Sequence, residues 1–152
     1  RRQRQMCIRD RGTGNVACGF LKGYGIKAGA VALSIAHDSH NIIVVGVSDE
    51  EMEFAVNSLI AQEGGMVLVR EGKVLESMPM PIAGLMSDQS GEWVDEKLTA
   101  IHAKAYEELG IAGDVEPVMT LCFMSLAVIP EVKLTDMGLF DVTTFSFIPV
   151  EA

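Results

Sequence analysis

Residues 31–47, VALSIAHDSHNIIVVGV, contain the pattern that decides the fold, which is two apolar runs around a short polar stretch. The runs at 31–36 and 42–45 are rich in β-branched residues and have the length of buried strands. Between them stand five consecutive polar side chains, at positions 37–41. Burying that many polar groups requires many hydrogen bonds. We therefore expect two strands joined by a turn that lines a pocket.

The polar turn, His37-Asp38-Ser39-His40-Asn41, has two interpretations. It can be an ordinary turn whose Asp38 and Asn41 hydrogen-bond to the nearby backbone. It can also be part of a functional site, because ionisable groups concentrate where chemistry is done. The i, i+3 spacing of His37 and His40, with Asp38 between them, is also found in metal sites on helices. This segment is a turn, however, and no distant partner ligand stands out, so we expect no metal site here.

Further elements are predicted outward from this pair of strands. Apolar runs at 16–21, 66–69 and 74–78 predict strands, the last two joined in a hairpin at Glu71-Gly72, and Phe145 and Phe147 alternate as a final strand. Periodic apolar residues predict a helix from Ser48 to Gly64 and another from Trp93 to Gly110. The sequence thus predicts an α+β fold. It is a single layered domain in which a mixed, largely antiparallel sheet packs against about two to four helices.

Two segments are harder to assign. Residues 119–128 are strongly apolar but of uncertain type. Residues 22–25 (KGYG) and Gly29 have the composition of a phosphate loop, but their spacing fits neither the P-loop nor the dinucleotide fingerprint. A tight hairpin is the better prediction for this glycine-rich stretch.

Composition excludes several classes of protein. The chain has 152 residues, 49% of them hydrophobic, which is too apolar for a disordered protein. Its net charge of −9 argues against a nucleic-acid partner, and no apolar run is long enough to predict a membrane partner. The three cysteines, Cys7, Cys18 and Cys122, include no CxxC pair and suggest neither a disulfide framework nor a zinc site. We expect a cytoplasmic protein.

The first eleven residues, RRQRQMCIRDR, differ from the rest, with five arginines and no evident apolar periodicity. They can be a basic arm, or the translation of an adaptor at the end of an assembled fragment. We expect residues 1–11 to be a non-native or disordered stretch, and residues 12–152 to be the domain. On that interpretation the natural protein continues upstream of Gly12.

Seven segments stand out, in order along the chain: TGN (13–15), GF (19–20), KGYG (22–25), AHDSHN (36–41), PMPIAGLMSD (79–88), MTL (119–121) and VIPEVKLTD (128–136). Together they resemble the C-terminal domain of bacterial adenine deaminase. The resemblance runs from about Gly12 to Phe147. Two places depart from the family pattern: Cys122 stands where serine is expected, and residues 115–118 differ from the usual Asp-Pro-Phe. Neither change touches the polar turn.

The resemblance implies part of a hydrolase that converts adenine and water to hypoxanthine and ammonia. Such enzymes are metal-dependent amidohydrolases whose barrel holds manganese or iron, and the metal activates the water that attacks the purine. The barrel's metal ligands are not found in this chain, so the resemblance implies a domain that binds no metal and is inactive alone. The implied partners are adenine, an upstream amidohydrolase barrel and further copies in a homo-oligomer.

Two roles for the domain remain open. In the first, it closes the mouth of the barrel. His37, Asp38 and His40 then serve catalysis as a proton relay or as groups near the metal ligands, and Ser39 and Asn41 bind substrate. Histidine and asparagine suit this role because both can hydrogen-bond to the edge of a purine. In the second, the domain only packs on the barrel or on its twin, with no direct catalytic role.

Overall fold

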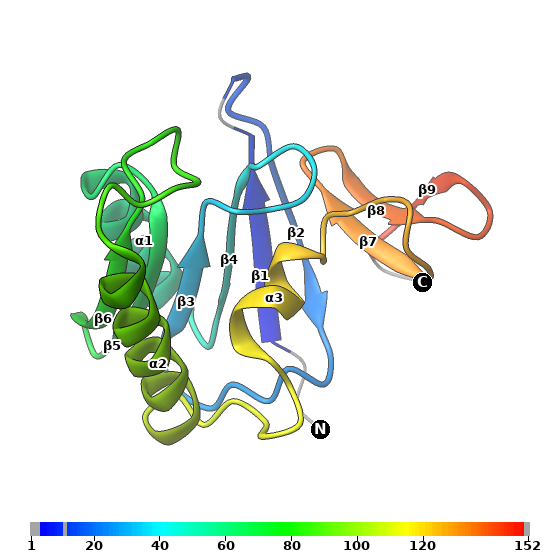
Figure 1. The fold of residues 1–152 in the computed structure, drawn as a ribbon. Coiled ribbons are helices and arrows are strands. Elements are labelled where there is room, and N and C mark those ends of the chain that lie inside the picture. Colours follow the sequence, from blue (N-terminus) through cyan, green and yellow to red (C-terminus); the bar gives the residue numbers. More distant parts are fainter. Residues whose placement is uncertain (1–3, 11, 151–152) are drawn as a thin grey trace.

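The centre of the domain is a six-stranded sheet (Figure 1). The structure is a computed structural model, and it describes residues 4–10 and 12–150. The strands lie in the order β2-β1-β4-β3-β5-β6, and every neighbouring pair is antiparallel. Their bounds are β1 Arg4–Arg9, β2 Val16–Leu21, β3 Ala30–Leu33, β4 Ile42–Gly46, β5 Gly65–Arg70 and β6 Lys73–Pro79. The predicted α+β class and largely antiparallel sheet are confirmed.

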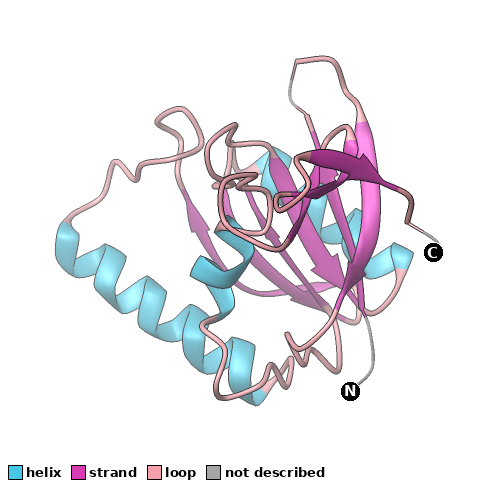
Figure 2. Cartoon of the chain, turned by 90° about the vertical axis from the view of Figure 1, so that its right-hand side faces the viewer, coloured by secondary structure: helices cyan, strands magenta, loops and turns pink. Residues whose placement is uncertain are grey.

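Helices cover both faces of the middle of the sheet. Helix α1 (Asp49–Ala61) packs on one face, and helices α2 (Gly91–Glu107) and α3 (Pro117–Cys122) lie on the other (Figures 1 and 2). All four side chains of β3 are buried because they alternate between these layers. Val31 and Leu33 belong to the core beside α2 and α3, whereas Ala30 and Ala32 pack with α1. This is why residues 31–36 read as a continuous apolar run.

The predicted helix boundaries agree with the structure to within a few residues. Ser48 caps α1 by accepting the backbone N–H of Glu51 at 3.3 Å, but the Glu51 carboxylate accepts from the N–H of Glu71 and not from Ser48. The helix ends in a Schellman motif in which Gly64 N–H donates to Leu59 O. The left-handed residue of this motif is Glu63, at φ 66°, and Gly64 follows it. The glycine cap is therefore one residue later than usual.

A second, three-stranded sheet is formed by the last part of the described chain. Its strands are β7 (Val132–Thr135), β8 (Gly138–Asp141) and β9 (Ser146–Ile148). The predicted final strand is confirmed at Phe147, whereas Phe145 lies in the preceding turn at a φ of 52°. It packs on β2 at Gly19, where an added Cβ would lie 3.3 Å from a methyl of Leu139. Three phenylalanines, Phe140, Phe145 and Phe147, form a cluster on this sheet with ring centroids 5.2 and 5.3 Å apart.

The glycine-rich segment 22–29 is a crossover, and the prediction of a tight hairpin was wrong. Strand β2 lies at the edge of the sheet, and β3 is separated from it by β1 and β4. The segment runs beneath the 109–117 region, where Tyr24 is buried and donates its hydroxyl to Pro117 O at 2.7 Å. Glycines show where a chain can bend, but they do not show which strand it joins next.

The structure also corrects the exclusion of residues 1–11 from the fold. Residues 4–9 form β1, which pairs with both β2 and β4 inside the sheet. The sequence signal for β1 is an alternation with a period of two: Met6 and Ile8 are buried in the core, and Cys7 between them faces the other side of the sheet. Because only two apolar residues of β1 face the core, this alternation is difficult to recognise among the arginines. Residues 1–3 and 11 lie outside the described residues.

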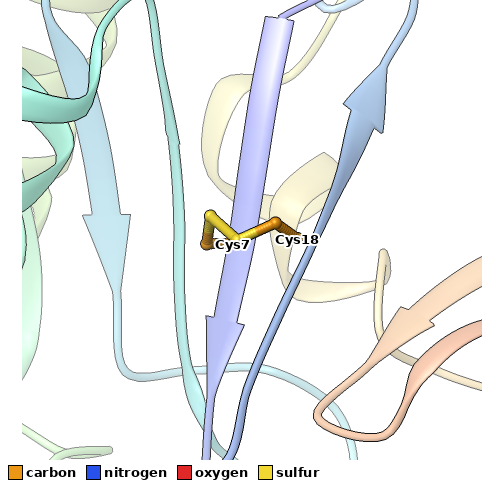
Figure 3. The surroundings of a disulfide bond; sticks show 2 residues. All are labelled: Cys7 and Cys18. Atoms are coloured by element: carbon orange, nitrogen blue, oxygen red, sulfur yellow. A yellow bond between two sulfur atoms is a disulfide. The ribbon is translucent and has the colours of Figure 1, made fainter. Parts of the chain in front are cut away.

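The cysteines of β1 and β2 form a disulfide that the sequence did not suggest. Cys7 and Cys18 stand opposite each other in the antiparallel register and are joined across the two strands (Figure 3). Spacing rules search for repeated short motifs, whereas this pair depends on the register of a hairpin. Cys122 is a free, buried thiol.

Among the described helices, none is both long and apolar enough to cross a membrane.

Candidate functional site

The polar turn joins β3 to β4 in an antiparallel hairpin, as predicted. We call residues 36–41 the histidine turn. Ala36 and Asn41 are buried at its two ends, and the backbone N–H of His40 donates to Ala36 O at 2.6 Å across it. The turn contains a cis peptide bond between His37 and Asp38, and His40 has a φ of 51°. The backbone of the turn is thus closed on itself.

The residues at the end of α3 hold the histidine turn in place. The backbone N–H of His37 donates to Cys122 O at 2.9 Å, and the hydroxyl of Ser125 donates to His37 O at 2.9 Å. The imidazole of His37 stacks on Phe123, with ring centroids 4.9 Å apart and 24° between the planes. The uncertain segment 119–128 therefore consists of a short helix and turns that anchor the site.

The side chains of the turn divide into three groups. Asp38 and Ser39 are exposed, His37 and His40 are half-buried, and Asn41 is only 3% exposed. The two imidazoles meet edge to face with centroids 5.4 Å apart. Nδ1 of His40 is buried and has no hydrogen-bond partner among the described residues. Leaving such an atom unpaired is costly, typically about 1–3 kcal/mol.

Two more loops lie at the same end of the sheet as the histidine turn (Figure 1). They are the β1–β2 turn at 10–15 and the connection from β6 to α2 at 80–90. The second is tied to the end of β3, because the Ser34 hydroxyl donates to Gly84 O at 2.5 Å and accepts from Gly65 N–H at 2.7 Å. Loops gathered around a rigid scaffold are the usual position of functional residues.

The remaining histidine has a structural role. His102, on α2, pairs through Nε2 with Glu116 Oε1 at 2.6 Å, and the other oxygen of Glu116 accepts from the N–H of Met119 at the start of α3. This pair joins α2 to α3. The part of the chain that the structure describes contains no group of three or more His, Cys, Asp or Glu side chains arranged to hold a metal ion.

Two hollows among the described residues lie away from the polar side chains of the turn. One, of about 370 Å³, is mostly apolar and opens beside α1. Its walls are formed by Gln5, Cys7, Arg9, Val16, Ile42, Val44, Asp49, Met52, Glu53 and Val56. A second, of about 150 Å³, lies between the end of α1 and the start of β4. Residues 37–41 line neither hollow, so the turn is presented on a surface and not within one of these cavities.

Comparison with known proteins identifies the family to which this domain belongs. A family model described as the adenine deaminase C-terminal domain matches residues 4–146. The chain belongs to this family. It is 73% identical over 144 residues to adenine deaminase 2 of Desulfotalea psychrophila, covering 95% of this chain and 25% of that protein.

More distant adenine deaminases show the same partial coverage. Adenine deaminase of Halalkalibacterium halodurans is 53% identical over 135 residues, covering 89% of this chain and 23% of its own length. The Nitratidesulfovibrio vulgaris protein is 51% identical over 142 residues, covering 93% and 25%. The chain thus spans about a quarter of the length of the curated relatives it matches. The family match also begins within β1, which supports its place in the domain.

Three of the segments that carry the resemblance lie in the loops around the site. Residues 13–15, 36–41 and part of 79–88 occupy the three loops at the histidine-turn end of the sheet (Figure 1). The segment 119–121 lies in α3, directly before the residues that anchor His37. In this adenine deaminase C-terminal domain, the family pattern therefore maps largely onto the turn and its supports.

Proposed function

We propose that this domain works within an adenine deaminase, which hydrolyses adenine to hypoxanthine and ammonia, and that the histidine turn faces the active site of the rest of the enzyme. The observation that carries the proposal is the contrast within the turn. Its backbone is fixed by bonds to Cys122 O and from Ser125, yet the side chains of Asp38 and Ser39 are exposed. A rigid backbone that presents exposed polar side chains is suited to binding.

Each side chain has a chemical role in this proposal. Asp38 and the two histidines hold or move protons during the hydrolysis, because carboxylate and imidazole groups are common general acids and bases. Ser39 donates or accepts a hydrogen bond at the purine edge. Asn41, which is only 3% exposed, is the second residue that we assign to substrate binding. None of these roles is that of a primary metal ligand.

The metal of the reaction belongs to another part of the enzyme in this proposal. Manganese or iron would supply the activated water. The histidine turn does not fit such a metal, because its two imidazoles and one carboxylate are not brought together as a set of ligands among the described residues. No step of the proposal therefore passes through a metal held by these residues.

Single substitutions in a full-length adenine deaminase that carries this domain test the proposal. His37→Ala, Asp38→Ala and His40→Ala should each lower kcat by about ten- to ten-thousand-fold while bound metal is unchanged. Asp95→Ala, an exposed carboxylate on α2, is the matched control and should leave kcat unchanged. Near-normal kcat in all three variants would show that the turn is scaffold, and loss of metal would show that it ligates.

A second candidate function is packing alone, on the rest of the enzyme or on another copy. It is favoured by the apolar surface of the small sheet, where Phe145 is 77%, Met137 is 72% and Phe147 is 52% exposed. Exposed aromatic clusters of this kind mark protein interfaces. In that case, Phe145→Ser and Phe147→Ser should change the assembly of the enzyme, whereas the histidine-turn variants should not affect turnover.

A further inference from the structure

The disulfide between β1 and β2 lies where two opposed strands bring their side chains closest together. Cys7 and Cys18 are direct partners in the register, and their Cα atoms are 4.2 Å apart. That separation belongs to a non-hydrogen-bonded pair of an antiparallel ladder, in which side chains of opposite strands approach most closely. The two sulfurs therefore meet through the strand pairing, although the cysteines have a sequence separation of 11.

Both cysteines can be reached from solvent. The outer face of β2 is bare: Cys18 is exposed, and its neighbours on that face, Val16 and Phe20, are 58% and 63% exposed. Cys7 is half-buried and forms part of the wall of the hollow beside α1. At about 370 Å³, this hollow has the size of pockets that take small molecules. A small thiol can thus approach the sulfur of Cys18 directly and that of Cys7 through the hollow.

The third cysteine provides a contrast within the same chain. Cys122 is 1% exposed in the core beneath the histidine turn, and burial raises the pKa of its thiol to about 11. The thiolate is the form that attacks disulfides, so Cys122 is poorly suited to exchange. Thiol–disulfide exchange in the described part of the chain is therefore assigned to the β1–β2 pair.

We propose that Cys7 and Cys18 form a reversible thiol–disulfide site, which exchanges with small thiols of the glutathione class and controls how tightly β2 and the 10–15 turn are held to β1. This goes beyond the adenine deaminase proposal and does not depend on it. The turn at 10–15 lies at the same end of the sheet as the histidine turn (Figure 1), so the redox state of the pair acts on the surroundings of the candidate site.

The reaction is a two-electron exchange. A small thiolate attacks the exposed sulfur of Cys18, the S–S bond breaks, and its electron pair leaves on Cys7, which takes up a proton. A second small thiolate then attacks the mixed disulfide and releases the Cys18 thiol. The protein disulfide is reduced and two small thiols are oxidised to one small disulfide. Oxidation by glutathione disulfide runs through the same steps in reverse.

Loss of the disulfide leaves β2 weakly held. Its remaining ties are the ladder to β1, the packing of Ala17 and Leu21 on the core, and the packing of Gly19 against the small sheet. The residues of its outer face are exposed. The 10–15 turn is closed by its own bonds, from the N–H and hydroxyl of Thr13 to the Asp10 carboxylate. The anchors of the histidine turn, at 122–125, lie elsewhere. Reduction should therefore loosen one side of the loop cluster and leave the other side unchanged.

The direct test is native alkylation of the folded chain in glutathione buffers. In excess glutathione disulfide, N-ethylmaleimide should label neither Cys7 nor Cys18, and their peptides should be recovered linked. After transfer to excess reduced glutathione, both should be labelled, and reoxidation should restore the link. Cys122 is the internal reference and should stay unlabelled. Failure to form the linked peptide in oxidising buffer, or its persistence in native reducing buffer, would overturn the proposal.

A measurement of thermal stability tests the second part of the proposal, that the disulfide holds β2 to β1. Reduction should lower Tm of the wild-type chain by roughly 5–10 °C, which is the scale expected for a short closed loop in a domain of this size. The Cys7→Ser/Cys18→Ser variant should show no such dependence on reductant, whereas Cys122→Ser should keep it. Hydrogen exchange should rise on reduction at 10–20 and stay constant at 36–41. Equal Tm in both redox states would contradict a role for the pair in holding β2.

Discussion

The β3–β4 hairpin and the β1–β2 hairpin end in turns at the same end of the sheet, but they are held in different ways. Both faces of β3 are covered by helices, and its turn is bonded to the residues after α3. The outer face of β2 is bare, and a disulfide joins β2 to β1. The candidate site therefore lies on the β3–β4 hairpin, which burial holds in place, beside the β1–β2 hairpin, which a disulfide links covalently.

The largest expected effect is on catalysis, because neither hairpin provides a set of metal ligands among the described residues. The purified chain should produce no hypoxanthine from adenine above background, even with manganese supplied, because its described residues include no cluster suited to a catalytic metal. A coupled assay or chromatography of the products would detect the reaction. Hypoxanthine formation by the isolated chain would mean that the site is more complete than the two hairpins suggest.

The next effect compares the hairpins through the same substitution. Val31→Ala, in β3, removes two carbons from a fully buried site and should cost about 2–3 kcal/mol of unfolding free energy. Val16→Ala, in β2, removes them from a side chain that is 58% exposed and should cost no more than about 0.5 kcal/mol. Denaturant unfolding measures both values. Equal costs would show that the outer face of β2 is covered in solution.

The smallest effect is a loss of stability at alkaline pH, located beneath the histidine turn. Burial raises the pKa of Tyr24 well above its ordinary value and that of Cys122 to about 11. The pKa values of both groups are higher in the folded state than in the unfolded state. Their contribution to the free energy of unfolding is therefore complete below about pH 9. That contribution is lost as pH rises through 10 and 11. In denaturant melts, Tyr24→Phe and Cys122→Ser should each flatten the decline, whereas Cys7→Ser/Cys18→Ser should not.

Sequence reasoning worked best for the hairpin that burial fixes. The apolar runs around residues 37–41 predicted β3, β4 and the turn, because strands buried on two faces leave a continuous pattern. The same logic predicted α1 and α2, whose apolar residues recur at helical spacing. These elements are determined by local patterns that any single sequence displays.

Strand β1 was missed, although residues 16–21 predicted its partner β2, because the signal of β1 depends on distant partners. In β1, only Met6 and Ile8 face the core, and neither the alternation nor the pairing with β4 is evident beside five arginines. The disulfide followed from that register, so it was missed as well. The anchors of the site, Phe123 and Ser125, had no recognisable signal, since their contacts with His37 span more than eighty positions of sequence.

The most direct test of the central claim is a crystal structure of a full-length adenine deaminase that carries this domain, with hypoxanthine bound. The account predicts that Asp38 or one of the two histidines lies within about 3–4 Å of the purine or of a water bound to it, at hydrogen-bonding distance. A histidine turn that faces solvent, more than about 10 Å from the purine, would contradict the account.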